Sequence, residues 1–369
     1  MRVVVAPDAF KGTIDAAAAA DALAAGWRSV RAADEVRCLP MADGGEGTLA
    51  AVVSASPGAR LFDVPGVTGP DGRPVPGRFA LLPDGTAVVE LATASGLPLL
   101  EGELLPLSAT TRGTGETVAA ALDAGARRLL LGLGGSASTD GGHGLLSALG
   151  ARLRDGAGEQ LPPAPADFDL DRALAAARTV DLSALRPAPP GGVVLLTDVT
   201  NPLLGARGAA AVYGPQKGAG EREVALLERR LARWSELLGG DPAAPGAGAA
   251  GGTGYGLAAA WGALVEPGAA AVAGLLGLPA AVAAADLVVT GEGSFDATSL
   301  QGKAVGEVVR IADGAGVPSA VVAGVSEAPG VLTLSALAGS PLAARRDPAR
   351  WLHRAGAVLA AHHDAPRRS

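Results

Sequence analysis

Cysteine is nearly absent from this sequence, because Cys38 is the only one among 369 residues. A single cysteine excludes an internal disulfide and every metal site built from clustered thiolates. Aromatic residues make up only 3% of the chain, and no basic stretch is interleaved with them, so the pattern of a nucleic-acid-binding surface is missing. We interpret Cys38, which lies within VRCLPM, as an inert buried thiol.

Long apolar runs and an excess of positive charge are also missing. No run reaches the roughly 18 residues that a membrane-spanning helix needs, and the opening MRVVVAPDAF turns polar too soon for a signal peptide. A formal net charge of -7 argues against electrostatic binding to nucleic acid. We therefore expect a cytoplasmic protein that binds small molecules, and neither nucleic acid nor a membrane.

Hydrophobic residues make up 49% of the chain, which is enough for a large core and, at this length, more typical of two domains than of one. Apolar runs that end in glycine-rich loops alternate with helical patterns, as in βα units. Residues 61–101 instead alternate like antiparallel strands. We predict an α/β protein with a Rossmann-like parallel-sheet domain built from both termini (1–62 and 285–369) and a second α/β domain (63–284) inserted in the middle.

The stretch from Leu129 to Leu149 contains the clearest loop between a strand and a helix. Leu129–Leu133 predicts a buried strand, GLLSAL predicts a helix, and GGSASTDGGHG stands where they meet. Glycine amides, hydroxyls and a helix N-terminus suit a phosphate or a carboxylate. Asp140 would be repelled by that anion unless it holds a metal, accepts a proton or orients a hydroxyl, and these roles stay open. An acid beside an anion site suggests phosphoryl transfer.

Other predicted strand ends carry similar residue types. Their charged and amide side chains are Asp8, Lys11, Asp43, Glu46, Asp198, Asn201, Lys217, Glu292, Asp296 and Lys303. Carboxylate and amide oxygens suit Mg²⁺, and lysine neutralises phosphate. Arg112, near the start of a helix that we expect Thr114 to cap, suits a carboxylate. DPAAPGAGAAGGTGYG at 241–256 is open between a linker and a further anion loop.

Eight stretches together resemble the bacterial glycerate kinases of the type I family, which phosphorylate D-glycerate with ATP in glycolate, glyoxylate and sugar-diacid catabolism. They are APDAFKGT at 6–13, ADGGEGT at 42–48, ATASGLPL at 92–99, TTRGTGE at 110–116, GGSASTDGG at 134–142, DVTNPLLG at 198–205, YGPQKGA at 213–219 and GEGSFDATSLQGKA at 291–304. One glycine-rich stretch is weak evidence, whereas eight in order are specific. The chain departs from the usual family pattern at Ala9 and Thr298, and neither change removes a charged group.

The resemblance implies a Rossmann-like domain and a second α/β domain, with the active site in the cleft between them. It also implies ATP and Mg²⁺, and it favours 2-phosphoglycerate over 3-phosphoglycerate as the product. We expect the loops at 8–13, 43–48, 134–144, 198–201, 213–219 and 291–303 to converge around one cavity. A homo-oligomer stays an open alternative.

We assign the candidate residues to four roles. The catalytic ones are Asp198, Lys217, Lys303 and Asp43, with Asp198 favoured as the base and Asp43 or Asp296 as alternatives. The substrate-binding ones are Asp8, Lys11, Arg112, Ser138, Asp140 and Asn201. The residues for nucleotide phosphates are Gly134, Gly135, Gly141, Gly142, Gly291 and Gly293. The metal ligands are Glu46, Glu292 and Asp296.

Two other classes of function stay open. GLGGSA at 132–137 formally satisfies the dinucleotide-binding fingerprint of an NAD-dependent oxidoreductase. That fingerprint needs a helix where this chain has STDGGHG, and no acidic residue ends a following strand at the expected distance. The other alternative is a non-catalytic ligand-binding protein, against which the set of Asp, Glu and Lys side chains argues.

Overall fold

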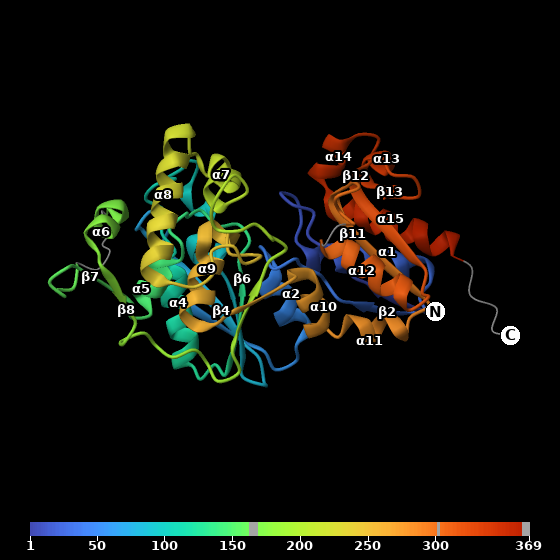
Figure 1. Cartoon of the computed structure of the whole chain (residues 1–369). Helices are drawn as coiled ribbons and strands as arrows, with labels where there is room; N and C mark the ends of the chain where they lie inside the picture. Colours follow the sequence, from blue (N-terminus) through green and yellow to red (C-terminus); the bar gives the residue numbers. More distant parts are fainter. Residues whose placement is uncertain (162–168, 301–302, 364–369) are drawn as a thin grey trace. The chain divides into compact units, whose positions relative to one another are not determined.

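Two compact units make up the chain in the computed structural model, which describes residues 1–161, 169–300 and 303–363. The first unit contains Met1–Asp43, Ala50–Pro57 and the described residues from Pro267 onward, drawn blue and orange to red in Figure 1. The second contains Gly44–Leu49 and Gly58–Glu266, drawn mostly cyan to yellow. Each unit has its own sheet and its own apolar core.

The sheet of the first unit has five parallel strands in the order β13-β12-β11-β1-β2. In that order they span Leu332–Thr333, Ser319–Ser326, Leu287–Phe295, Arg2–Val5 and Glu35–Cys38. Val3, Val4 and Val5 are all buried, although successive side chains of a strand point to opposite faces. Both faces of this sheet are therefore covered, as is usual for parallel strands.

The helices of this unit come from both ends of the chain. They are α1 (Ala16–Val30), α2 (Thr48–Ala55), α10 (Gly268–Leu275), α11 (Leu278–Ala283), α12 (Ala304–Gly314), α13 (Leu334–Ala338), α14 (Pro341–Arg346) and α15 (Pro348–His362), and the division between the units passes through α2. Of these helices, α1, α12, α13 and α14 pack directly on the sheet. The most extensive contact between two helices of the described residues is that of α1 with α15. A Cβ on Gly26 would lie 1.8 Å from the His353 carbonyl oxygen, and one on Gly356 would lie 2.1 Å from that of Leu23. Only glycine fits at this crossing.

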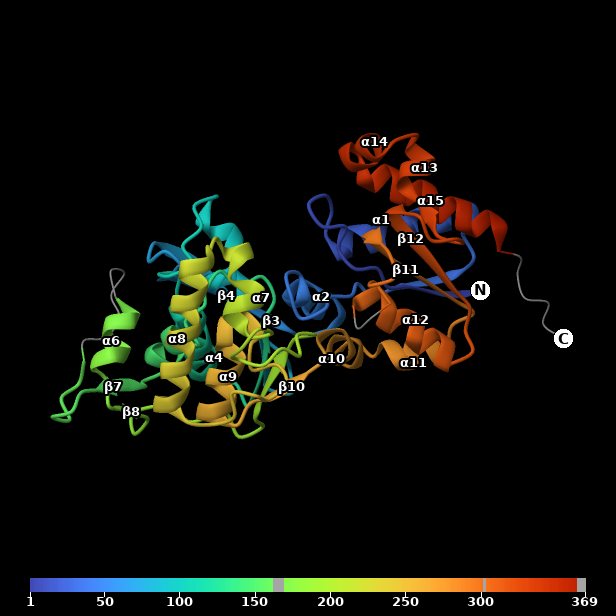
Figure 2. The same ribbon diagram turned by 45° about the horizontal axis from the view of Figure 1, so that its top comes forward.

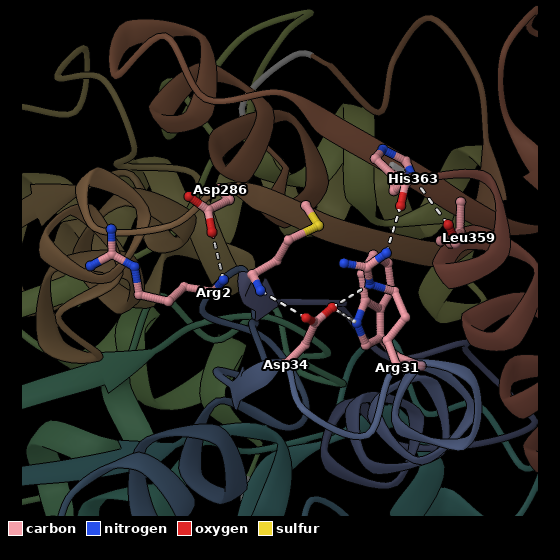
Figure 3. A network of polar contacts seen from close by, with 8 residues as sticks. Arg2, Arg31, Asp34, Asp286, Leu359 and His363 are labelled. Atoms are coloured by element: carbon pink, nitrogen blue, oxygen red, sulfur yellow. Dashed lines mark hydrogen bonds and ion pairs between the residues drawn. The ribbon is translucent and has the colours of Figure 1, made fainter. Parts of the chain in front are cut away.

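Within the first unit, a polar network joins the N-terminal segment to His363, the last described residue (Figure 3). The Asp34 carboxylate accepts hydrogen bonds from the amino group of Met1 at 2.7 Å, from Trp27 Nε1 at 3.0 Å and from Arg31 Nε at 2.5 Å. Arg31 also donates from Nη1 to the carbonyl oxygen of His363 at 2.9 Å. Burial raises the pKa of Asp34, but these donors outweigh burial and lower the pKa to about 2.

The sheet of the second unit has six strands in the order β10-β9-β6-β5-β4-β3. In that order they span Leu264–Glu266, Val193–Leu196, Arg128–Gly132, Thr86–Glu90, Pro74–Leu81 and Arg60–Thr68. The four strands from β10 to β5 run parallel, whereas β4 and β3 continue the sheet as antiparallel strands. A separate two-stranded sheet pairs β7 (Arg152–Arg154) with β8 (Thr179–Asp181).

Helices of the second unit bury leucines and two large aromatic side chains, Trp234 and Tyr255, against the sheet. The helices are α3 (Ala92–Ser95), α4 (Arg112–Asp123), α5 (His143–Ala148), α6 (Leu170–Ala176), α7 (Ala209–Tyr213), α8 (Glu221–Leu238) and α9 (Ala249–Trp261), with short 3₁₀ turns η1 (Leu97–Leu100) and η2 (Pro215–Lys217). Figure 2 shows α8 and α9 side by side, and they pack together. None of the helices in the described ranges combines the length and apolarity needed to cross a membrane.

The structure confirms the predicted fold class and corrects several details. The chain passes between the units at 57/58 and 266/267, where we expected 62/63 and 284/285, and also at 43/44 and 49/50 around the segment Gly44–Leu49. The later boundary moves to 266/267 because α10 and α11 pack on α12 of the first unit. Thr114 lies inside α4, and its hydroxyl donates to Ser95 Oγ at 2.8 Å in place of capping the helix. The stretch at 241–256, which the sequence left open between a linker and an anion loop, leads directly into α9 within the second unit. It is therefore not an interdomain linker.

Candidate active site

A pocket of about 380 Å³ opens in the first unit at the carboxyl ends of its parallel strands. The loop after β1 and the end of β11 line it, and β1 and β11 are the adjacent strands from which the chain proceeds in opposite directions across the sheet. Open α/β sheets bind ligands at this kind of topological switch point. Six predicted site residues line the pocket: Asp8, Lys11, Asp43, Glu292, Gly293 and Lys303.

The carboxylates of this pocket carry negative charge that the protein compensates only in part. Burial, followed by the nearby charge of Asp43, raises the pKa of Asp8 to about 7. Burial also raises the pKa of Glu292, and its buried Oε1 has no hydrogen-bond partner within the part of the chain that the structure describes. A buried carboxylate oxygen of this kind indicates a missing donor or cation.

Two lysines bring positive charge to the same pocket. Lys11 follows β1 and Lys303 precedes α12, and both side chains are exposed. Asp296 lies close by: its Oδ1 accepts hydrogen bonds from the Thr298 amide at 2.7 Å and the Thr298 hydroxyl at 2.6 Å. The Lys303 ammonium lies 3.4 Å from that same hydroxyl. Thr298 thus connects a predicted metal ligand to a predicted catalytic lysine. Residues 301–302 of this motif lie outside the described residues.

The carboxylates of this pocket suit a Mg²⁺ ion that is held jointly by the protein and by the phosphates of a nucleotide. Among the described residues, no group of three or more His, Cys, Asp or Glu side chains could hold a metal ion by itself. Mg²⁺ typically takes one or two protein carboxylates and completes its coordination with phosphate and water. Glu292 Oε1, which lacks a partner among the described residues, and the neighbouring negative charges of Asp8 and Asp43 both favour a cation here. Glu46, the third predicted metal ligand, belongs to the second unit.

We expected Gly291 and Gly293 to lie in a loop that binds nucleotide phosphates. Both belong instead to β11, which continues through the GEGSF motif to Phe295. Gly291 is a buried strand residue: a Cβ there would lie 2.1 Å from the Val322 carbonyl oxygen of β12. Its own carbonyl accepts the Asp8 amide at 2.8 Å, which places Asp8 at the pocket. Gly293 lines the pocket beside Lys11.

In the second unit, Asp140 holds together the loop that we expected to bind an anion. Its Oδ2 accepts the Thr111 amide at 2.9 Å, the Thr111 hydroxyl at 2.8 Å and the Gly144 amide at 3.2 Å, and its Oδ1 accepts the Gly142 amide at 3.0 Å. The Thr111 hydroxyl in turn accepts the Leu145 amide at 2.9 Å. Asp140 therefore joins the starts of α4 and α5, which explains why a carboxylate stands in this loop.

Of the four glycines of the same loop, Gly141 and Gly142 are buried, Gly134 is half-buried and Gly135 is exposed. The amides of Gly141 and Gly142 donate to Gly251 and Asp140, and a Cβ on Gly141 would lie 2.4 Å from Trp234. These two amides are not available to a phosphate, which corrects that assignment. Gly134 packs against Gly45 and its amide donates to the Gly44 carbonyl oxygen at 3.4 Å, while Gly135 is exposed at a positive φ of 75°.

Lys217 is the most buried cation of the second unit, with 3% of its surface exposed. Its ammonium donates to the Ser138 carbonyl oxygen at 2.5 Å and to Ser136 Oγ at 3.3 Å. Burial lowers the pKa of Lys217 to about 8, and the Asp140 charge acts in the opposite direction. The structure thus brings together Lys217, Ser138 and Asp140, all predicted from the sequence.

Three predicted residues at other loops have contacts of their own. Arg112 forms an ion pair with Glu116 at 2.9 Å. Asn201 accepts from the Tyr213 hydroxyl at 2.7 Å and donates to the Arg207 carbonyl at 2.8 Å, so its amide orders the loop after β9. Asp198 is exposed just beyond the end of β9.

Sequence reasoning missed Glu90, a buried carboxylate at the carboxyl end of β5. It accepts the Leu49 amide at the start of α2, and burial raises its pKa to about 7. A charged residue directly after the apolar run AVV was the available signal. The rarity of lysine was a further signal of function, this time for the candidate lysines. Lys11, Lys217 and Lys303 are the only lysines in the sequence, against 27 arginines.

The sequence of the chain is similar to those of known proteins over most of its length. The model of the glycerate kinase family matches residues 3–339. The chain belongs to the glycerate kinase family. A glycerate kinase of Bacillus subtilis is 41% identical over 332 residues, which are 88% of this chain and 85% of the relative. A glycerate 2-kinase of Escherichia coli is 39% identical over 320 residues, which are 85% of this chain and 82% of the relative.

A solved structure extends this likeness to the fold of the family. The crystal structure of a Salmonella typhimurium protein assigned as glycerate kinase 2 matches with a TM-score of 0.84 at 36% identity, and the match covers 98% of this chain and 97% of that chain. The predicted family and enzyme class are therefore confirmed. The oxidoreductase alternative is not favoured, because α5 begins only at His143, beyond the loop that follows GLGGSA.

Proposed function

We propose that this chain transfers the γ-phosphoryl group of ATP to D-glycerate and that Mg²⁺ is required. The observation that carries the proposal is the switch-point pocket, in which two of the three lysines of the chain meet carboxylates suited to Mg²⁺. Phosphoryl transfer depends mainly on positioning and on neutralising charge, so these residue types suffice. The Escherichia coli relative is named a glycerate 2-kinase, which supports the 2-hydroxyl as the acceptor.

The residues of each unit supply different parts of this chemistry. In the first unit, Lys11 and Lys303 neutralise phosphate oxygens, while Asp43 and Glu292 would hold Mg²⁺. When bound, Mg²⁺ withdraws charge from the phosphate oxygens. In the second unit, Lys217 holds the 136–138 loop in place through Ser138 and adds positive charge.

The product identifies both the reaction and the acceptor oxygen. We expect phosphorus NMR of a reaction with D-glycerate, ATP and Mg²⁺ to show ADP and 2-phosphoglycerate. Accumulation of 3-phosphoglycerate would contradict the acceptor oxygen while supporting the kinase. If the ATP signals stay unchanged in the presence of D-glycerate, the proposed substrate is contradicted.

The scarcity of lysine allows a direct test of the phosphate contacts. Because the chain has only three lysines, mass spectrometry after amine labelling reports each of them separately. We expect ADP with Mg²⁺ to protect the exposed Lys11 and Lys303 from labelling, whereas buried Lys217 labels slowly with or without the nucleotide. Unchanged labelling of Lys11 and Lys303 would contradict their assignment.

Asp198 stays the favoured base, and the substitution Asp198→Asn tests it. Asparagine keeps the shape of the side chain and removes its charge and basicity. We expect kcat to fall about 10²-fold with the affinity for ATP within a few-fold of wild type. Unchanged turnover would transfer the role to Asp43 or Asp296. Loss of Mg²⁺-dependent ATP binding, with normal kcat at saturating metal, would make Asp198 a metal ligand.

A further inference from the structure

The pocket of the first unit has a second, chemically different end. Besides its charged residues it is lined by Val325, Leu334, Pro341, Ala344 and Pro348, with Arg345 at the same end. These residues come from the end of β12 and from α13, α14 and α15. Figure 1 shows α13 and α14 beside β12, against which they pack. The pocket therefore joins a charged end to an apolar wall.

This wall has no evident use for a small hydroxy acid. Glycerate carries a carboxylate and two hydroxyl groups and has no apolar face to bury. The pocket volume of about 380 Å³ lies within the range of roughly 300–1,000 Å³ found for larger organic ligands, whose sites combine apolar walls with a few polar groups. Both its size and its wall suit a planar ring system joined to a charged group.

The wall is also preorganised. Pro341 and Pro348 are the first residues of α14 and α15, where the fixed φ of proline matches the helix. The Ser340 hydroxyl caps α14 by accepting the Ala343 amide at 3.2 Å. Leu334 and Ala344 belong to the apolar core of the unit. A rigid apolar surface loses little entropy when a flat ring packs on it.

We propose that this wall is the nucleoside subsite of the enzyme, with the base of ATP packed against Val325, Leu334 and Ala344 and its phosphates directed to Lys11 and Lys303. The assignment rests on the proposed function for the identity of the nucleotide. It follows the rule that a nucleotide lies across the strand ends with its phosphates at the switch point. Arg345, an exposed planar cation at the rim, stacks on the base or contacts the ribose.

Two substitutions at the wall test the subsite, and each has a matched control. Val325 is 37% exposed, so Val325→Trp fills the apolar end without entering the core. Arg345→Glu reverses the charge at the rim. Leu342→Trp and Arg346→Glu make the same kinds of change at exposed positions of α14 that do not line the pocket. Calorimetric titrations with ADP and with inorganic tripolyphosphate, both with Mg²⁺, separate base binding from phosphate binding.

We expect Val325→Trp to weaken ADP binding about tenfold or more and Arg345→Glu to weaken it severalfold, and the two controls to match wild type. Val325→Trp should leave tripolyphosphate binding and the KM for glycerate within about twofold. The subsite would be overturned if both Val325→Trp and Arg345→Glu bind ADP as the wild type does. It would also be overturned if Val325→Trp loses affinity for ADP and for tripolyphosphate to the same extent. ADP binding that depends on Val325, in a wild type that does not phosphorylate glycerate, would support the subsite and contradict the proposed substrate.

Discussion

Lysine and arginine are not interchangeable at the buried position 217. The Lys217 ammonium is a compact charge that reaches a carbonyl and a hydroxyl of the 136–138 loop with 3% of the residue exposed. A guanidinium is larger and planar, and its donors are fixed in one plane. In a chain that otherwise uses arginine for its cations, the three lysines mark places where a point charge is needed.

We therefore expect Lys217→Ala to lower kcat/KM about 10²-fold, and Lys303→Ala to do the same, because each removes charge that stabilises the transition state. Lys217→Arg should not restore activity. Arg229→Ala, at an exposed position of α8, is the control and should behave as wild type. Steady-state kinetics with D-glycerate and ATP check these outcomes, and near-wild-type kcat/KM in Lys217→Ala would reduce this lysine to a support of its loop.

His143 makes stability depend on pH in a defined direction. It is buried and stacks edge-on against Trp234, with ring centroids 5.4 Å apart, and burial lowers its pKa. The unfolded chain therefore binds this proton more readily than the folded chain, so this contribution to stability is present above about pH 6.5 and is lost as the pH falls below it.

Urea unfolding at several pH values between about 5 and 7 measures this contribution. We expect the free energy of unfolding of the wild type, compared with that of His143→Gln, to fall toward the acid end, because the raised pKa values of Asp8 and Glu90 act equally in both proteins. His353→Gln, at an exposed position of α15, should keep the wild-type slope. Equal slopes for all three proteins would rule out His143 as the cause.

At the scale of elements, the crossing of α1 and α15 is the least tolerant contact of the first unit. A methyl group at Gly356 would meet the Leu23 carbonyl oxygen at 2.1 Å, so the helices must separate to admit it. We expect Gly356→Ala to lower the free energy of unfolding by about 1–3 kcal/mol. Gly274→Ala is the control, because nothing lies within 4 Å of a Cβ at that exposed position of α10.

The control substitution has the opposite expected sign. Alanine in place of a helical glycine reduces the entropy of the unfolded chain and should raise stability by up to about 1 kcal/mol. Chemical unfolding of both variants checks the pair. Equal effects of Gly356→Ala and Gly274→Ala would show that helix propensity, and not the crossing, governs both positions.

Elements with a strong local pattern were predictable from the sequence, and those that depend on a distant neighbour were not. The charged amphipathic pattern of 221–238 predicts α8 with its bounds. By contrast, GEGSF predicts a loop, although it is a strand whose Gly291 faces the backbone of β12. The lysines and acids of the pocket were found because polar residues follow apolar strands. The packing role of Gly141 was missed because it depends on Trp234, far along the chain.

For the whole molecule, the division into units predicts which fragments fold. Residues 44–266 contain every strand of the six-stranded sheet, whereas residues 1–57 contain β1 and β2 without β11, the other neighbour of β1. We expect the fragment 44–266 to give a cooperative urea transition and dispersed NMR signals, and the fragment 1–57 to give neither. A folded 1–57, or an unstructured 44–266, would contradict the independence of the two cores.

The central position of β1 has a consequence for biosynthesis. Val3 pairs with Leu287, and translation at about 5–20 residues per second separates the emergence of these two residues by roughly 15 to 60 s. During that interval the three N-terminal valines have no β11 to pair with, while the six-stranded sheet can already assemble on the ribosome. The residues of β1 are thus synthesised well before β11 can bury them, and until then their apolar side chains are exposed to aggregation or to chaperones.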